Sequence, residues 1–268
     1  MDNLQYAFGA LPPKIDVRDY KVASAAICKT ILPIEYYWEP VAKVKNQGAV
    51  SSCVAHAMST ILEFHDNGQH ELSTNFIYGG QKSICGRDGA GMYLRDACKI
   101  ANKYGDTLEK HCGGNNEVPN CYSIADAALN NEEALGIAAA FKISSYADLK
   151  SNDDIKYAIM TYGPVLASVK WYDDTKVKNG KMVSSYEGDY GYHAIVLYGW
   201  NEEGFLMQNS WGKTWGNGGR AILPYDYKIR EAKGIVDAAN DDIVVPPSNT
   251  ILDFIYKIIN FFANLFRK

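Results

Sequence analysis

The chain has 268 residues, of which 47% are hydrophobic and 22% are charged, so it can bury an ordinary core in one domain or two lobes. Its formal net charge of -4 and pI near 5.8, without an interior run of Lys and Arg, argue against nucleic-acid binding. The N-terminus has neither a basic start nor an apolar stretch of about 7–15 residues, so we expect no signal peptide in this chain. A cytoplasmic location or export by another route would fit.

The first half of the chain is predicted to be mainly helical. Residues 1–30 contain a Pro-Pro pair and are expected to form an N-terminal arm. From Ser52 to Asn67-Gly68, apolar residues recur at helical spacing, which predicts a helix with one buried face. The same periodicity predicts a second helix over 92–103. Residues 106–125 carry Gly-Gly and Asn-Asn pairs without a period and are predicted to be a loop.

The chain changes character after residue 140. Four short runs are rich in β-branched and aromatic residues and are separated by turn residues, which predicts strands: FKISSYADL, GPVLASVKW, GYHAIVLYGW and GFLMQNSW. A helix over 151–161 is predicted to interrupt them. We therefore expect an α+β arrangement with a helical lobe over about 31–140, a β lobe over about 141–228 and a cleft between them. A linker is predicted over 229–248.

The last segment, 249–268, is predicted to be an amphipathic helix. Its polar residues recur at steps of four and three, which leaves a wide apolar face. At about 1.5 Å per residue such a helix is shorter than the roughly 30 Å hydrocarbon core of a bilayer. We expect it to dock on the body or to mediate self-association, with contact to a membrane surface as the alternative.

Cys53 begins the first predicted helix, a position that can activate a thiol. A cysteine attacks carbonyl groups as the thiolate, and a helix N-terminus beside a base lowers the thiol pKa from about 8.5 into roughly 3.5–7.5. His193 could be that base, and Asn209 could accept its ring N–H and orient it. Gln47 could place its amide beside the Cys53 N–H to bind an oxyanion. Together these four residues predict nucleophilic catalysis at a carbonyl group.

Each of these residues also has a purely structural interpretation. Free cysteine is among the most often buried residue types, so Cys53 alone would be taken as a core thiol, and His193 alone as a core histidine. His56 shares a helical face with Cys53 and is a rival base, although a base one turn along the same helix is poorly placed to reach the leaving nitrogen. The combination of four residues favours catalysis, with His56 as a packing residue.

Three blocks of the sequence, NQGAVSSCVAHA, GYHAIVLYGW and QNSWGKTWGNGGRAILPYDY, resemble the signature blocks of the papain family of cysteine peptidases. The resemblance spans about residues 31–228 and implies a papain-like two-lobe fold, with a helical left lobe, an antiparallel β-barrel-like right lobe and the active-site cleft between them. It implies that Cys53 is the nucleophile, His193 the base, Asn209 the orienting amide and Gln47 the oxyanion donor. Trp211 matches the indole that shields the His–Asn hydrogen bond.

The same resemblance bears on the arm, the substrate and the cysteines. Departures from the family pattern at 50, 51 and 54 are similar to the bacterial-type branch, whose short N-terminal segment implies that 1–30 acts as a short propeptide over the cleft. Cys85–Cys121 is the preferred disulfide, with Cys85–Cys112 as the alternative. The resemblance also implies substrate contacts for Trp211 and for four further positions: Gly91, Met92, Ser168 and Ala194.

The sequence therefore predicts a cysteine-type peptidase that cleaves a peptide or protein substrate through an acyl-enzyme. The resemblance implies no metal ion and no organic cofactor. The alternative is a catalytically silent papain-like scaffold that acts in binding, assembly or membrane association through 249–268.

Overall fold

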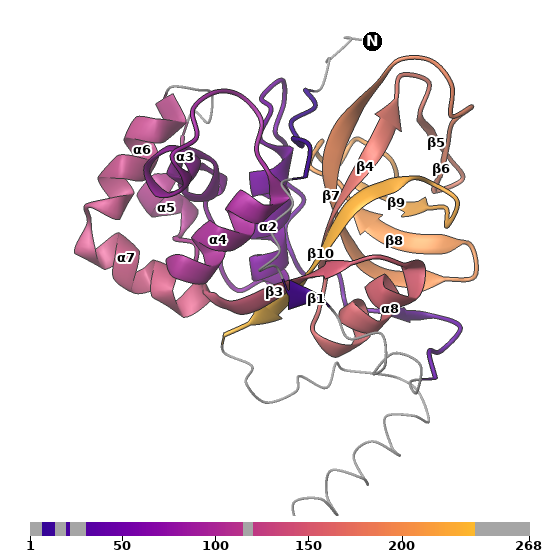
Figure 1. The fold of residues 1–268 in the computed structure, drawn as a ribbon, viewed down its shortest axis with the longest axis horizontal. Coiled ribbons are helices and arrows are strands. Elements are labelled where there is room, and N and C mark those ends of the chain that lie inside the picture. Colours follow the sequence, from indigo (N-terminus) through magenta and orange to yellow (C-terminus); the bar gives the residue numbers. More distant parts are fainter. Residues whose placement is uncertain (1–6, 14–19, 22–30, 115–119, 239–268) are drawn as a thin grey trace, which may run out of the picture.

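The computed structural model describes residues 7–13, 20–21, 31–114 and 120–238. The predicted C-terminal helix, the later part of the predicted linker and most of the N-terminal arm lie outside these residues. Figure 1 shows helices gathered on one side and a large sheet on the other, with α2 (Cys53–His65) between them. This is the expected α+β fold with two lobes. No helix in the described part of the chain is long and apolar enough to span a bilayer.

The helical lobe is built around α2, whose residues 53–64 are all buried. Helix α2 packs against α3, α4 and strands of the sheet, so it is the shared core of both lobes. The predicted helices over 52–68 and 92–103 correspond to α2 and α4. The remaining helices of this lobe are α3 (Thr74–Cys85), α4 (Leu94–Lys103), α5 (Glu109–Cys112), α6 (Asn120–Leu129), α7 (Glu132–Ala138) and the short 3-10 helix η1 (Ala139–Phe141).

The prediction of a loop over 106–125 is wrong at both ends. Helix α5 and the first turns of α6 lie within this range, and α6 packs along α3. Cys112 and Cys121 are buried on these helices, where they contribute to the core of the lobe. Tertiary packing thus provides the helical stability that the local sequence does not announce.

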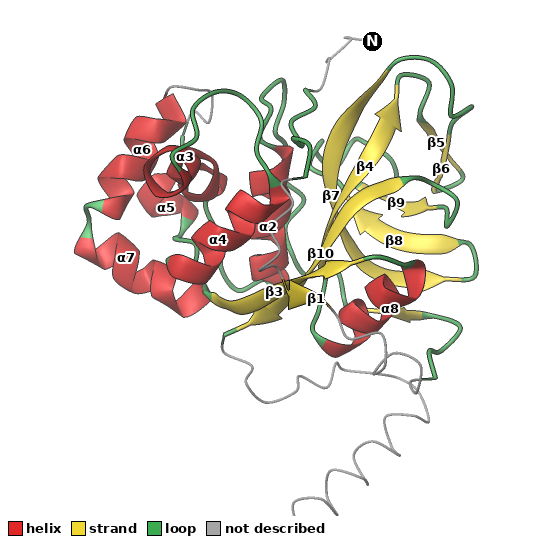
Figure 2. Ribbon diagram, in the orientation of Figure 1, coloured by secondary structure: helices red, strands yellow, loops and turns green. Residues whose placement is uncertain are grey.

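The β lobe is one sheet of mostly antiparallel strands, coloured yellow in Figure 2. The strands follow each other in the order β1-β3-β10-β4-β7-β8-β9-β6-β5, with β2 paired to β7, so the sheet does not close into a barrel within the described residues. The strands are β1 (Tyr20–Lys21), β2 (Tyr36–Tyr37), β3 (Ile143–Leu149), β4 (Val165–Tyr172), β5 (Lys176–Lys178), β6 (Lys181–Val183), β7 (Tyr190–Asn201), β8 (Gly204–Gln208), β9 (Arg220–Leu223) and β10 (Ile229–Asp237).

The predicted linker over 229–248 is wrong in its first part. Residues 229–237 form β10, which pairs with β3 on one side and with β4 on the other. The segment looks polar because it carries Lys233, but this side chain is 2% exposed and bonds to Asp148 on β3. A cross-strand partner compensates the buried charge, so the strand belongs to the domain.

Helix α8 (Asn152–Thr161) interrupts the strands as predicted and begins with a capping box. The Ser151 side chain accepts the Asp154 backbone N–H, and the Asp154 carboxylate accepts the Ser151 N–H, both at 3.0 Å. The helix packs against β7 and β10 and covers the sheet at its lower end in Figure 1. This support fixes the central strand β7, which carries His193.

Candidate active site

The fold brings Cys53 next to the strand that carries His193, where α2 meets the sheet. Cys53 is the first residue of α2, and His193 lies near the start of β7; both are buried. The backbone N–H of Ala194 donates a hydrogen bond to the Cys53 Sγ at 3.4 Å. Residues 141 positions apart in the sequence therefore meet because β7 packs against α2.

Asn209 holds the imidazole ring of His193. It follows β8, and its Oδ1 accepts from His193 Nε2 at 2.7 Å and from the Ser210 N–H at 2.8 Å. Because Oδ1 also accepts a backbone N–H, the orientation of the amide is fixed and the ring proton is assigned to Nε2. The other ring nitrogen, Nδ1, is buried and has no hydrogen-bond partner among the described residues. It is the nitrogen available to exchange a proton with the thiol.

Two indole rings enclose the imidazole. The Trp211 ring lies 4.6 Å from the His193 ring at 34°, and the Trp171 ring contacts it edge-on at 5.1 Å. Trp171 was missed by the sequence analysis. Its signal is the strand register: Trp171 pairs with Gly191, two positions before His193, so both side chains lie on the same face. That register becomes readable only when the pairing of β4 with β7 is known.

Gln47 lies in the loop before α2 and is held from the β lobe. Its backbone N–H donates to the Ser210 carbonyl at 2.8 Å, and its Oε1 accepts from the Ser210 hydroxyl at 2.6 Å. These contacts orient the Nε2 donor, which bonds to the carbonyls of Ala7 at 2.9 Å and Val50 at 2.8 Å. The Ala7 carbonyl shows that this amide can hold a peptide oxygen.

A segment of the N-terminal arm covers this site. We call Ala7–Leu11 the covering segment; in Figure 1 the indigo start of the described chain lies between α2 and β7. Ala10 donates to the Tyr192 carbonyl at 3.2 Å, Leu11 donates to the Met92 carbonyl at 2.9 Å, and the Met92 N–H donates to the Gly9 carbonyl at 2.8 Å. The segment is thus hydrogen-bonded to both lobes and bridges the active site.

The covering segment excludes water from the site, which shifts the pKa values of Cys53 and His193. Burial raises the pKa of Cys53 to about 11, although N–H groups of Ala194 and Gly9 bonded to the sulfur oppose the rise. Burial lowers the pKa of His193 to about 4, and its bond to Asn209 opposes the fall. In the covered state near neutral pH the pair is therefore a thiol and a neutral imidazole.

Of the expected substrate-contacting residues, Gly91 and Met92 lie against the covering segment. The hydrogen bonds to the segment come from Met92 rather than Gly91. The Gly91 N–H donates to the Tyr78 hydroxyl and its carbonyl accepts from Arg87. Ser168 and Ala194 are paired across β4 and β7, and both are buried.

Two other expectations are decided by the structure. His56 is buried, and its Nδ1 lies 3.0 Å from the Ser52 carbonyl and 3.2 Å from the Ser52 hydroxyl. Burial lowers the pKa of His56 to about 4. The preferred Cys85–Cys121 disulfide is wrong for this structure, and so is its alternative, because no disulfide bond joins Cys85 to Cys121 or to Cys112. The packing of α3 against α6 connects these segments without a covalent bond.

The chain resembles known proteins over most of its length. Residues 35–235 match the family described as "Papain family cysteine protease". An uncharacterized peptidase C1-like protein of Acanthamoeba polyphaga mimivirus is 30% identical over 207 residues, which cover 69% of this chain and 65% of that protein. A cysteine protease of Blomia tropicalis is 26% identical over 70% of this chain and 60% of that protein. The chain thus spans less than two thirds of these curated relatives.

The fold is also that of a solved structure. Xylellain, a cysteine protease from Xylella fastidiosa, superposes with a TM-score of 0.71 at 21% identity, covering 88% of this chain and 98% of that chain. At this identity the likeness concerns the fold alone. The sequence match over 35–235 reaches from before α2 into β10 and includes both lobes. The chain belongs to the papain family of cysteine proteases.

Proposed function

We propose that this chain is a cysteine peptidase that hydrolyses peptide bonds through an acyl-enzyme formed on Cys53. The observation that carries the proposal is the Cys53 sulfur at the start of a helix, bonded to the backbone N–H of Ala194, directly after a histidine whose far nitrogen is fixed by Asn209 at 2.7 Å. The remaining ring nitrogen and the thiol are the two groups without which acyl transfer cannot start.

The proposed mechanism uses His193 as a base and then as an acid. His193 Nδ1 takes the Cys53 proton, and the sulfur attacks the carbonyl carbon. The Gln47 amide and the Cys53 backbone N–H bind the oxyanion, an interaction worth about 2.7–4 kcal/mol per donor. The imidazolium then protonates the leaving amine. In the second half-reaction His193 takes a proton from water, which hydrolyses the thioester and restores the thiol.

A peptide assay tests this proposal. Wild type is expected to hydrolyse members of a fluorogenic peptide library, and Cys53→Ala is expected to lose this activity while keeping the same circular dichroism spectrum. Hydrolysis that persists in folded Cys53→Ala would refute the mechanism. If neither protein cleaves any peptide after the covering segment is displaced, the silent scaffold becomes the better explanation.

We further propose that the covering segment keeps the enzyme inactive, as a short propeptide. Its contacts with Gln47, Met92 and Tyr192 occupy donors and acceptors that a substrate backbone would need. The group of Gly9 that meets the sulfur is an N–H, and its carbonyl is turned to Met92. The segment therefore blocks the site without presenting the Gly9 carbonyl carbon to the nucleophile. The short segment and the departures at 50, 51 and 54 also support a place in the bacterial-type branch.

Gly9 offers a precise way to displace the segment. A Cβ at this position would lie 2.1 Å from the Ser51 carbonyl oxygen, a backbone atom that cannot move aside easily. Gly9→Ala is expected to raise the rate of peptide hydrolysis and of Cys53 alkylation at pH 7 by about tenfold or more, because loss of about 1.4 kcal/mol of closure corresponds to a factor of ten. Mass spectrometry of iodoacetamide-treated protein measures the alkylation.

Gly136→Ala is the matched control. Gly136 lies in α7, where a Cβ meets no atom within 4 Å, so the added methyl group should leave both rates unchanged. Equal rates in wild type, Gly9→Ala and Gly136→Ala would show that Ala7–Leu11 does not limit access to Cys53.

The C-terminal segment 249–268 stays a separate part of the proposal, because it lies outside the described residues. The apolar face predicted from its sequence supports docking or self-association, and contact with a membrane surface is the alternative. Sedimentation velocity of the full chain, with and without anionic vesicles, separates these outcomes: a concentration-dependent dimer supports self-association, and co-sedimentation with vesicles supports the membrane surface.

A further inference from the structure

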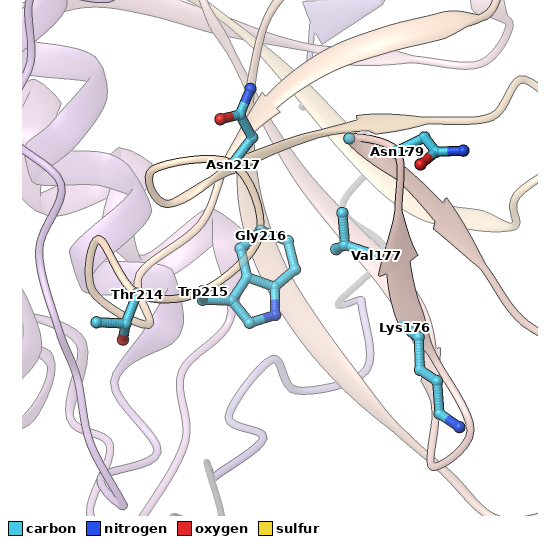
Figure 3. A pocket seen from close by; sticks show the side chains of 8 residues that line it. Lys176, Val177, Asn179, Thr214, Trp215, Gly216 and Asn217 are labelled. Carbon is cyan, nitrogen blue, oxygen red and sulfur yellow. The ribbon is translucent and has the colours of Figure 1, made fainter.

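Besides the pocket at the active site, a second pocket lies on the β lobe, away from the four residues of the catalytic site. It has a volume of about 550 Å³ and separates the β5–β6 hairpin from the loop before β9. Figure 3 shows the Trp215 ring facing Val177 of β5, with Thr214 and Asn217 on the loop. The lining residues are Lys176, Val177, Asn179, Gly180, Thr214, Trp215, Gly216 and Asn217.

This pocket adjoins the leaving-group side of the active site. A pocket of about 770 Å³ is lined by Phe8 of the covering segment together with Trp171, Trp211 and Thr175. Trp215 contacts both indoles of that first pocket, at 5.9 Å and 5.8 Å between ring centroids, and also lines the second one. Thr175 lines the first pocket, and the next residue, Lys176, lines the second. The three packed indole rings of Trp171, Trp211 and Trp215 thus separate two neighbouring pockets.

The position relative to the bond that is cleaved follows from His193. In the proposed mechanism this ring protonates the leaving amine, and Trp211 lies against it at 4.6 Å. A substrate residue that passes Trp211 therefore belongs to the leaving part. The rings of Trp211 and Trp215 add a further 5.8 Å, and an extended peptide advances about 3.3 Å per residue, so about the third residue after the cleaved bond reaches the second pocket.

The lining of the second pocket is basic and has no acid. Lys176 is exposed, and within the described residues its amine has neither a hydrogen bond nor an ion pair. Lys178, on the same strand, and Lys213, beside Thr214, are also exposed. None of the lining residues is Asp or Glu. The amides of Asn179 and Asn217 and the hydroxyl of Thr214 add neutral hydrogen-bond donors.

We propose that this pocket is a leaving-side subsite that selects substrates with an Asp or Glu about three residues after the cleaved bond. The carboxylate would pair with Lys176, and its aliphatic stem would lie on Trp215 and Val177. This inference rests on the proposed peptidase function and adds to it a substrate class. A neutral or basic side chain would lose the ion pair, and a Lys there would face Lys176.

Quenched fluorescent peptides test the subsite. Three peptides differ only in the third residue after the cleaved bond, which is Glu, Gln or Lys, and a second set moves the change to the fourth residue. The Glu peptide is expected to have a kcat/KM about two- to fivefold above that of the Lys peptide, as for an exposed ion pair, and high salt should reduce the ratio. The ratio does not depend on the fraction of uncovered enzyme, because both peptides use the same fraction.

Charge reversal decides the assignment. Lys176→Glu is expected to invert the ratio in favour of the Lys peptide. Lys110→Glu makes the same charge change at an exposed position of α5 in the helical lobe and should keep the wild-type ratio. A wild-type ratio near one in both sets, or a ratio that Lys176→Glu and Lys110→Glu change equally, would overturn the proposal.

A short substrate with a coumarin leaving group distinguishes failure of the subsite proposal from failure of the proposed peptidase function. It has no residue beyond the cleaved bond and cannot reach the second pocket. If wild type cleaves it but shows no preference among the longer peptides, the subsite is wrong and the peptidase stands. If neither substrate type is cleaved by wild type or by Gly9→Ala, both proposals fail together.

Discussion

The two ends of helix α2 lie in equally dry surroundings but differ in what keeps the water out. At the first turn, Cys53 is buried with His193 beneath the covering segment. Toward the last turns, Ser59 and Glu63 are buried inside the helical lobe, beside Lys45 and Asp106. We call Lys45, Glu63 and Asp106 the buried ionic cluster.

The buried ionic cluster is fixed by direct pairing. Lys45 Nζ lies 2.7 Å from Glu63 Oε1, with side-chain exposures of 7% and 1%, and it also donates to the Leu72 carbonyl at 2.9 Å. Asp106 accepts the Ser59 hydroxyl at 2.7 Å. A charge that the core encloses permanently needs a permanent partner.

The catalytic pair, Cys53 and His193, is buried without a charged partner in the part of the chain that the structure describes. It carries no counter-ion within the described residues, and it is neutral while covered because burial raises the pKa of Cys53 and lowers that of His193. Its cover is a short stretch of backbone rather than a core. Desolvation is therefore reversible at one end of the helix and permanent at the other.

Breaking the ion pair of the cluster should give the largest effect. Lys45→Met leaves Glu63 without its cation in a buried site and is expected to lower the free energy of unfolding by about 3–5 kcal/mol. The Lys45 carbonyl also accepts the Gly212 N–H at 2.9 Å, two residues before Gln47, so the loop that carries Gln47 is anchored at the same point. Urea unfolding followed by tryptophan fluorescence measures the change.

Lys43→Met is the control for this prediction. Lys43 pairs with Glu71 at 2.7 Å, but the side chains are 60% and 44% exposed, so water screens the pair. Its loss should lower the free energy of unfolding by less than about 1 kcal/mol. Equal losses for the two variants would mean that burial does not distinguish the pairs.

The sequence predicts the site better than it predicts the helical lobe, for a physical reason. Catalytic chemistry needs particular residue types, so Cys53, His193, Asn209 and Gln47 stand out by type and local motif. Helix α3 gives no such signal, because Gly79 and Gly80 resemble a helix break. A Cβ at Gly79 would lie 2.0 Å from the Cys121 carbonyl oxygen. The glycine is therefore required by the close packing of α3 on α6, which only the tertiary structure reveals.

Contacts with the covering segment were equally invisible in the sequence. The sequence predicts an arm from its prolines, but no pattern shows that Gly9 lies on Cys53 or that Met92, rather than Gly91, supplies the backbone pairing. The contacts are made by main-chain atoms, which every residue has. Strand β10 was missed for a related reason, since the partner of Lys233 lies on another strand.

Removing the carboxylate of Asp106 should flatten the pH dependence of stability. Burial raises the pKa of Asp106 well above its ordinary value, although its bond to Ser59 and the charge of Lys45 act against this. The folded state thus favours the protonated acid, and its stabilisation is complete below about pH 4 and is lost as the pH rises through the higher folded value. In that window the free energy of unfolding should fall by up to about 1.4 kcal/mol per pH unit.

Asp106→Asn should reduce this slope without abolishing it, because burial also raises the pKa of Glu63 and that residue titrates with the same sign. Urea midpoints between pH 4 and 8 measure the slope. Asp189→Asn removes the same charge at an exposed position before β7 and should keep the wild-type slope. A slope unchanged by Asp106→Asn would mean that the buried carboxylate is ionised throughout.

The cover over the catalytic pair should open as the pH moves away from neutral in either direction. In the covered state the pKa of His193 is about 4 against an ordinary 6.5, so the uncovered state gains a proton first and is favoured as the pH falls below 6.5. The pKa of Cys53 is about 11 against 9.0, so the uncovered state also loses its proton first and is favoured above pH 9. Closure is therefore strongest between about pH 6.5 and 9.

The measurement is the alkylation rate of Cys53 in Gly9→Ala divided by that in wild type at the same pH, which cancels the intrinsic thiolate reactivity. This quotient should be largest between pH 6.5 and 9 and should fall by up to about tenfold per pH unit below 6.5, toward one. Gly136→Ala should give a quotient of one throughout. A quotient for Gly9→Ala that stays constant from pH 5 to 8 would show that opening takes up no proton, and burial beneath Ala7–Leu11 would then not be what keeps the imidazole neutral.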